Sequence, residues 1–274
     1  MLYEQAFMSL PEFLTGLPYQ DFDYEGTLMS AFSMAVLQEL NGRNINNPIS
    51  CLRSEVTYPA ALGKRADIHL DLDAMKILTP DLRKYGIYRN NWLEAKYFRL
   101  NDAGKPTVDS LKVVLLILKD IIRLVSLPPE NDFPTSNAAS YLLHAYQGNP
   151  KKHIAERKNS RGGATGFTRS WARKIRLAGI QEIDQIHLQN EVGQFDSVIG
   201  NALRGLEISF KATNFVYEPS TQDASVFWCY LTRIDDFKVC LGQDWYERKS
   251  GVYTESAIGA RHSIITAIVA GLAE

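Results

Sequence analysis

Three side chains suited to phosphodiester hydrolysis occur in two segments whose patterns are typical of strands. Residues 65–72 alternate in polarity and place Asp67 on the polar side, and residues 92–98 carry Glu94 and Lys96 two positions apart. Side chains at positions i and i+2 of a strand leave the same face, so Glu94 and Lys96 are expected to lie together. Two carboxylates can hold Mg²⁺, and an adjacent lysine can orient or deprotonate the attacking water or stabilise negative charge. The pattern predicts a metal-dependent hydrolytic site, provided that the two strands are neighbours.

The surrounding sequence predicts the elements that would hold these residues. Helical spacing of apolar residues, with Asp23 as the N-cap, predicts a helix over 23–40. A second, strongly apolar helix is expected over 108–127, ended by two prolines, and a third over 255–272. Strands are expected at 52–58 and 65–72, which form a β-hairpin, and at 92–98, 138–146, 206–216, 226–234 and 237–241.

These elements predict an α/β fold with a central mixed β-sheet flanked by helices. Residues 1–149 hold a leading helix, the hairpin, the Glu94 strand, a helix and a strand. Residues 150–274 are expected to add a basic segment and further strands with a final helix, as an α+β elaboration of the same compact unit.

Asp67, followed by Glu94-Ala95-Lys96 on the next strand, resembles the pattern of the PD-(D/E)XK nuclease superfamily, and so does the order of the elements over residues 23–146. The resemblance implies a restriction-endonuclease-like core, Asp67 and Glu94 as metal ligands, and Lys96 as a catalytic residue. The sequence departs from the family pattern in two ways. Ala66 stands where the proline is usual, and residues 74–91 must form an insertion between the two strands.

The resemblance also implies a further glutamate near the metal, from the leading helix. Glu25 fits that position, and Glu55 on the first strand is the competing candidate. Glu25 also has a structural explanation, because an acidic residue in the first turn of a helix is stabilised by the helix dipole. Glu94 and Lys96 have one as well, as a cross-strand ion pair on a solvated face. The apolar residues around Glu94 favour the functional interpretation, because a charge on a buried strand needs a partner or a role.

Residues 150–177 form a basic tract with interleaved aromatic residues and three glycines. Such a segment suits contact with a phosphate backbone, and the alternative is a solvated loop joined to an amphipathic helix. Arg161, Arg169 and Lys174 are the predicted DNA-binding residues. The basic residues of the tract are Lys151, Lys152, Arg157, Lys158, Arg161, Arg169, Arg173, Lys174 and Arg176.

Composition excludes several other classes of protein. The 274-residue chain has a net charge of −1, so only local charge can attract nucleic acid. Its three cysteines, Cys51, Cys229 and Cys240, lack the spacing of a zinc site or a disulfide framework, which favours a reduced, cytoplasmic protein. No apolar segment is long enough to cross a membrane, the first residues do not resemble a signal peptide, and no nucleotide-binding glycine motif occurs.

The sequence thus predicts a Mg²⁺-dependent endodeoxyribonuclease that acts on double-stranded DNA, with the 3′-oxygen as the leaving group that the resemblance implies. A sequence-specific type II restriction enzyme of a restriction-modification system is the expected form. A homodimer is expected too, because cutting both strands of a symmetric site calls for two active sites. The alternatives are an exonuclease, repair nuclease or nonspecific defence nuclease of the same fold, and a nucleic-acid-binding scaffold without catalysis.

Overall fold

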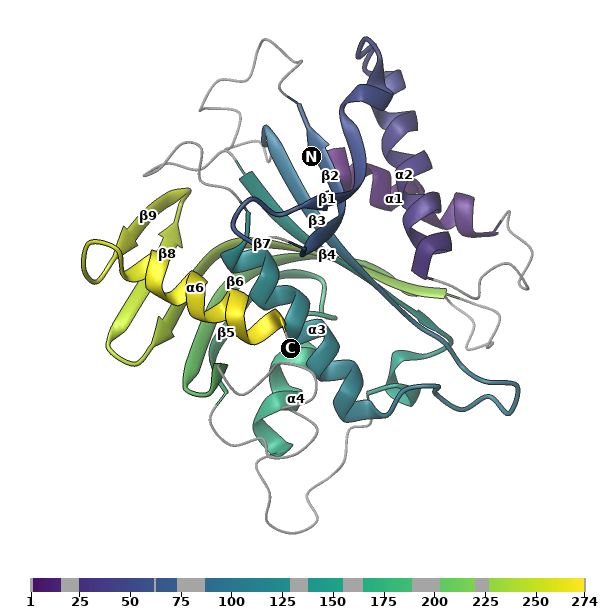
Figure 1. Ribbon diagram of the computed structural model, residues 1–274. Helices are drawn as coiled ribbons and strands as arrows, with labels where there is room; N and C mark the ends of the chain where they lie inside the picture. The colour runs from purple at the N-terminus through teal and green to yellow at the C-terminus, as the bar shows by residue number, and fades with distance from the viewer. Residues whose placement is uncertain are drawn as a thin grey trace.

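A nine-stranded mixed sheet forms the centre of the protein in the computed structural model (Figure 1). The structure describes residues 2–15, 25–61, 63–72, 87–128, 138–154, 165–188, 203–219 and 227–273. The main strand order is β1-β2-β3-β4-β7-β6-β5, and β8 and β9 extend the sheet from β7. The strands are β1 (Leu52–Thr57), β2 (Arg65–Asp71), β3 (Asn90–Phe98), β4 (Ala138–Gln147), β5 (Gly179–His187), β6 (Leu206–Tyr217), β7 (Phe227–Leu241), β8 (Asp244–Lys249) and β9 (Val252–Glu255).

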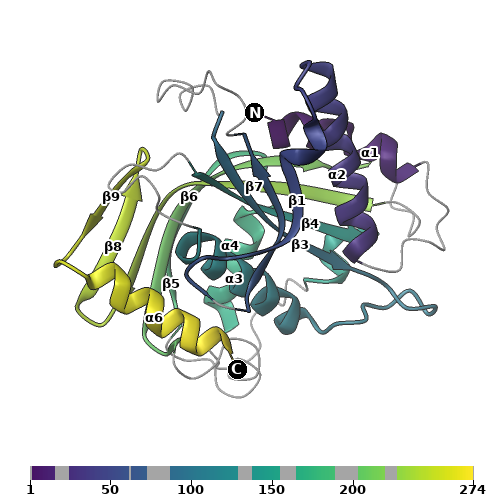
Figure 2. The same ribbon diagram turned by 45° about the horizontal axis from the view of Figure 1, so that its top comes forward.

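Helices cover both faces of this sheet, which confirms the predicted α/β fold with flanking helices. In Figures 1 and 2, α1 and α2 lie on one side of the strands, and α3, α4 and α6 lie on the other. Each layer buries its own apolar core against the sheet. The helices are α1 (Leu2–Thr15), α2 (Glu25–Gly42), α3 (Ser110–Ser126), α4 (Thr165–Lys174) and α6 (Ala260–Ala273), with short 3₁₀ turns η2 (Pro48–Ser50) and η4 (Pro150–Lys152). None of the described helices combines the length and apolarity that a membrane span requires.

The arrangement of β2, β3 and β4 positions the predicted catalytic residues. β2 pairs antiparallel with β3 from Ile68↔Leu93 to Asp71↔Asn90, so the two strands are neighbours. β3 and β4 are parallel, as expected for strands joined by a crossover helix, here α3. The β2–β3 ladder ends at Ile68↔Leu93, one position before Asp67 and Glu94, so these two residues lie where the strands begin to separate.

Several elements differ from the expectations drawn from the sequence. The patterns considered above do not predict α1, β5 or the β8–β9 hairpin. The final helix begins at Ala260 rather than at residue 255, because residues 252–255 form β9. The expected strands 226–234 and 237–241 are one continuous strand, β7, whose register against β6 shifts near Asp235.

Candidate active site

Asp67, Glu94 and Lys96 meet on the side of β3 that faces α3. One Asp67 carboxylate oxygen accepts a hydrogen bond of 2.6 Å from the backbone N–H of Ala95, the residue between Glu94 and Lys96. Glu94 is 1% exposed, and it lies on the same face of β3 as Trp92 and Phe98, which belong to the same core as α3. The two predicted carboxylates and the lysine therefore lie together, as a shared site requires.

Lys96 forms ion pairs with carboxylates from two different helices. Its Nζ lies 3.1 Å from Glu25 at the start of α2 and 3.5 Å from Asp120 on α3. The same ammonium group donates a hydrogen bond of 2.9 Å to the carbonyl oxygen of Ala95. Because these partners come from α2, α3 and β3 itself, Lys96 joins both helical layers to the central strand.

Glu94 is held by two further side chains that the sequence did not indicate. The Tyr58 hydroxyl donates a hydrogen bond of 2.8 Å to Glu94 Oε1, and an Arg123 nitrogen lies 3.4 Å from Glu94 Oε2. Arg123 also lies 3.2 Å from Asp120, one helical turn earlier on α3. Each Glu94 oxygen thus has its own donor, which fixes the orientation of the carboxylate.

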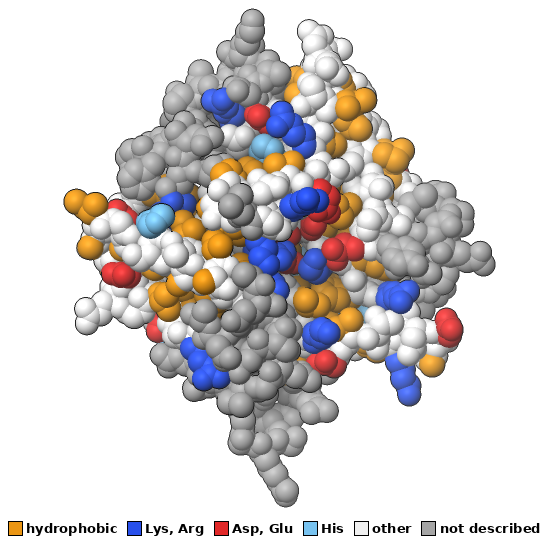
Figure 3. Space-filling model, viewed as in Figure 1, with side chains coloured by type: hydrophobic (Ala, Val, Ile, Leu, Met, Phe, Trp, Pro, Cys, Tyr) orange, Lys and Arg blue, Asp and Glu red, His pale blue; other side chains and the backbone are white. Residues whose placement is uncertain are grey.

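Together these residues form what we call the acid cluster. Its formal charge is −2 when all members are ionised, because four carboxylates face two cations. Near the centre of the face in Figure 3, acidic and basic side chains likewise lie beside one another. The members are Glu25, Asp67, Glu94 and Asp120, with Lys96 and Arg123 as the cations.

Burial changes the acidity of the two buried carboxyl groups, Glu94 and Asp120. Burial raises the pKa of Glu94 well above its ordinary value, and repulsion from Asp120 raises it further, against the attraction of Arg123. Burial also raises the pKa of Asp120 from 3.8 to about 6, although Lys96 and Arg123 act in the opposite direction. A further positive charge beside Glu94 would favour its ionised form.

For Lys96 the surrounding charges favour the ionised form. Burial lowers its pKa, but the neighbouring carboxylates of Asp120, Glu25 and Asp67 outweigh that effect, and the net pKa is raised. Lys96 is therefore an ammonium ion at neutral pH. In this state it can stabilise negative charge and orient a ligand, but it cannot accept a proton.

The donor set fits a hard divalent cation. Among the described residues, no group of three or more His, Cys, Asp or Glu side chains has the arrangement of a complete metal site. Mg²⁺ does not require such a group, because it is commonly bound through one or two carboxylates and keeps several waters. Asp120 Oδ2 is buried and accepts no hydrogen bond from the described residues, although Lys96 Nζ lies 3.5 Å away. A buried carboxylate oxygen without a hydrogen-bond donor, in the electrostatic range of the Asp67 carboxylate, suits a cation.

The two candidates for the additional glutamate differ clearly in position. Glu25 is the first residue of α2 and pairs with Lys96. Glu55 is exposed on β1, at a positive φ of 54°, and within the described part of the chain it takes no part in the ion pairs of the acid cluster. The geometry therefore favours Glu25 as the additional member.

The predicted DNA-binding residues are only partly covered by the structure. Arg161 lies outside the described residues, and Arg169 falls within α4 at a position whose side chain is not described. Lys174 ends α4, and its Nζ donates a hydrogen bond of 2.5 Å to the carbonyl oxygen of Glu182 on β5. This hydrogen bond links the end of α4 to β5.

Sequence reasoning missed Tyr58, Asp120 and Arg123. One signal was present: Asp120 and Arg123 have opposite charges and lie three positions apart in a helix that is otherwise apolar from residue 113 to 125 except at Lys119. Residues at this spacing lie on the same side of a helix, so a buried ion pair could have been expected there. Tyr58 gave no comparable signal, because a tyrosine at the end of a strand is common in any core.

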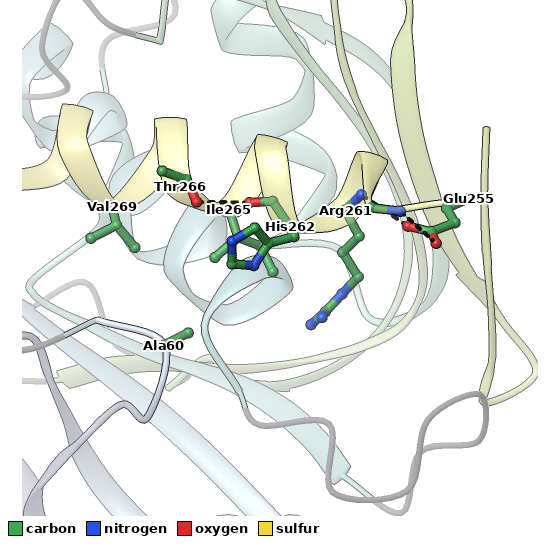
Figure 4. A pocket seen from close by; sticks show the side chains of 8 residues that line it. Ala60, Glu255, Arg261, His262, Ile265, Thr266 and Val269 are labelled. Atoms are coloured by element: carbon green, nitrogen blue, oxygen red, sulfur yellow. Dashed lines mark hydrogen bonds between the residues drawn. The ribbon is translucent and has the colours of Figure 1, made fainter. Parts of the chain in front are cut away.

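A cavity of about 570 Å³ lies apart from the acid cluster, between α6 and the β1–β2 connection. Figure 4 shows Arg261 and His262 extending from α6 on the side of Ala60. Glu255 accepts hydrogen bonds from the backbone N–H groups of Gly259 and Arg261, and so caps the start of α6. The carboxylate that lines this cavity thus has a structural role, and the acid cluster remains the better candidate for catalysis.

Comparisons with known proteins add no assignment to this geometry. A scan against protein-family models, a search of the curated proteins and a search of the solved structures each find no match. The functional argument therefore depends on the side chains of the acid cluster.

Proposed function

We propose that this chain is a Mg²⁺-dependent endodeoxyribonuclease that hydrolyses phosphodiester bonds of double-stranded DNA. One observation carries the proposal: the side chains of Asp67, Glu94 and Lys96, from adjacent strands, lie together beside the further carboxylates of Glu25 and Asp120. Glu94 and Asp120 are buried, whereas Asp67 and Glu25 are only partly buried, so a metal ion can reach this group of carboxylates from solvent.

Asp67 and Glu94 would hold the metal, and Asp120, whose Oδ2 has no hydrogen-bond donor among the described residues, would offer a further oxygen. Glu25 would support the site through Lys96. When bound, Mg²⁺ supplies Lewis acidity toward the phosphoryl oxygen and lowers the pKa of a coordinated water. Arg123 and Tyr58 keep the Glu94 carboxylate in a fixed orientation. Lys96, as an ammonium ion, stabilises the negative charge that develops on the phosphoryl group, which places its contribution in electrostatics rather than in proton abstraction.

A site-specific type II restriction enzyme acting as a homodimer is the form of this activity that we propose. A supercoiled plasmid incubated with purified protein and Mg²⁺ tests it, with Asp67→Ala and Lys96→Ala as matched variants. We expect discrete bands from wild-type protein and no cleavage products from the variants. A smear would instead indicate a nonspecific nuclease, and shortening only from the ends of linear DNA an exonuclease. Absence of cutting by wild-type protein on varied DNA and RNA would contradict the proposal and favour a scaffold.

A further inference from the structure

A second concave region lies where the end of β4, the end of α4 and the start of β7 meet. Its volume is about 440 Å³. We call it the basic pocket, and its charged and aromatic lining consists of Lys151, Arg173, Arg176, Glu218, Trp228 and Tyr230. These residues come from segments that are far apart in the sequence, so only the folded chain brings them together.

The charge of the basic pocket is opposite to that of the acid cluster. Three cations line it against one carboxylate, a formal charge of +2, although the whole chain has a charge of −1. The carboxylate of Glu218 accepts a hydrogen bond of 2.9 Å from the Tyr230 hydroxyl. Arg176 donates through Nε to the carbonyl oxygen of Ala172 at 3.1 Å, which fixes its guanidinium relative to α4. The pocket thus presents oriented positive charge, as an anion site requires.

Aromatic side chains stand beside these cations. Burial, followed by the carboxylate of Glu218, raises the pKa of Tyr230, so its hydroxyl stays protonated and donates to Glu218. Trp228 lines the pocket, and its buried indole N–H has no hydrogen-bond acceptor among the described residues. Cationic side chains together with neutral hydrogen-bond donors are the usual means of contacting the phosphate oxygens of DNA.

The register of the sheet relates the basic pocket to the acid cluster. Lys96 on β3 pairs with His144 on β4, and His144 pairs with Tyr230 on β7. Tyr230 is thus two strands away from Lys96 in the same row of the sheet. At about 4.8 Å per strand, their backbones are about 10 Å apart, so one bound DNA molecule can contact both regions.

We propose that the basic pocket binds a backbone phosphate of the DNA whose scissile phosphate lies at the acid cluster. The identity of the nucleic acid rests on the proposed function, but binding can be measured without cleavage. Lys151 and Arg173 are exposed and suit substitution, because truncating them leaves no buried group unpaired. Lys105, an exposed lysine in the turn after β3, provides a matched control.

The test is the salt dependence of binding to a fluorescein-labelled DNA duplex in EDTA, followed by fluorescence anisotropy. The Lys151→Ala/Arg173→Ala double variant should bind about fivefold more weakly, and the slope of log K against log salt should fall by about 1 for each phosphate that the variant no longer neutralises. Lys105→Ala should match the wild type. Equal melting temperatures of the three proteins show that the folds are comparable.

Each outcome separates this proposal from the nuclease proposal. A reduced slope in a protein that never cleaves DNA would support the pocket and reject the nuclease. A double variant that matches Lys105→Ala in affinity and slope would overturn the pocket proposal, even if wild-type protein cuts plasmid. A further experiment uses inorganic phosphate. It compares the melting temperature of the protein in phosphate with that in chloride at equal ionic strength. Phosphate stabilisation that disappears in the double variant without any change in the DNA slope would assign the pocket to free phosphate and also overturn the DNA contact.

Discussion

One row of paired residues in the sheet links the acid cluster to the basic pocket. The two regions differ in the sign of their formal charge and in how deeply their charged side chains are buried. The acid cluster brings together four carboxylates and two cations, and two of these carboxylates, Glu94 and Asp120, are each 1% exposed. The basic pocket places three cations around one carboxylate, and Lys151 and Arg173 are exposed. Burial magnifies electrostatic interactions, whereas solvent screens them.

This difference assigns different tasks to the two regions. In the acid cluster, burial raises the pKa of Glu94 and Asp120, so adding a cation changes the ionisation of the site itself. In the basic pocket, exposed cations contribute binding energy that depends on salt. Substitutions in the cluster should therefore alter the chemical step and metal binding, whereas substitutions in the pocket should alter affinity.

Lys96→Ala should cause the largest loss of cleavage activity. If it lowered DNA affinity instead of the cleavage rate, the proposed difference between the acid cluster and the basic pocket would be wrong. Loss of one preorganised cation at the developing charge lowers kcat by about 10²–10³-fold. Affinity for DNA, measured by anisotropy in EDTA, should stay within about twofold of wild type because the cations of the pocket remain. A Lys96→Ala variant that cuts normally but binds DNA poorly would place Lys96 in binding instead of catalysis.

The pH dependence of stability tests whether burial changes the ionisation of Asp120 in the acid cluster. The pKa of Asp120 is raised from 3.8 to about 6, so the native state binds more protons than the unfolded state between these values. The free energy of unfolding should therefore fall as pH rises through this window, by about 3 kcal/mol at most, since one pKa unit corresponds to 1.36 kcal/mol. Urea unfolding of wild type and Asp120→Asn between about pH 4 and 7 measures the contribution, and the variant should have the flatter profile. Parallel profiles would show that Asp120 ionises as it does in the unfolded chain.

Metal binding should distinguish Asp67 in the acid cluster from Glu55, the exposed glutamate outside it. At a Mg²⁺ concentration of about 100 times Kd, a site present only in the folded state stabilises the protein by about 2.7 kcal/mol. Asp67→Asn should abolish this stabilisation in urea unfolding experiments. Glu55→Gln, which replaces an exposed carboxylate outside the acid cluster, should retain it. Equal losses in both variants would contradict the placement of the metal at Asp67.

Tyr58→Phe should have the smallest effect. It removes the hydrogen bond to Glu94 Oε1 but leaves Arg123 on the other oxygen. The expected loss is about 1 kcal/mol of stability, typical of a single hydrogen bond, with a few-fold decrease in cleavage rate. Thermal unfolding and plasmid cleavage measure the two effects. A loss of activity as large as that of Lys96→Ala would mean that Tyr58 touches the reacting groups directly.

The sequence allowed much of the central sheet to be predicted, because its signals there are local. β2 alternates in polarity, and α3 has a clear apolar face that ends before two prolines. β5 escaped prediction because it is mostly exposed and its register shifts between Ile183 and Ile186, which disrupts the alternation. α1 contains Pro11, a residue that normally ends a helix.

The candidate site was predictable only in part. Glu94 and Lys96 share a strand, so their common face follows from a period of two. The choice between Glu25 and Glu55 depends on where α2 begins relative to β3, which only tertiary packing determines. Asp120 likewise joins the acid cluster because α3 packs on that face of β3, and no local pattern indicates this contact. The pocket cations Lys151 and Arg173 belong to the basic tract, but their position beside Trp228 is a property of the fold.

The most direct test of the central claim is single-turnover cleavage of a labelled DNA duplex across a magnesium titration. Wild-type protein should cleave with a saturable dependence on Mg²⁺, lose all cleavage in EDTA and recover it when Mg²⁺ is added back. Asp67→Asn should not cleave at concentrations that saturate the wild type. Cleavage that continues in EDTA, or an Asp67→Asn variant with the wild-type rate, would contradict a metal-dependent site built on Asp67, Glu94 and Lys96.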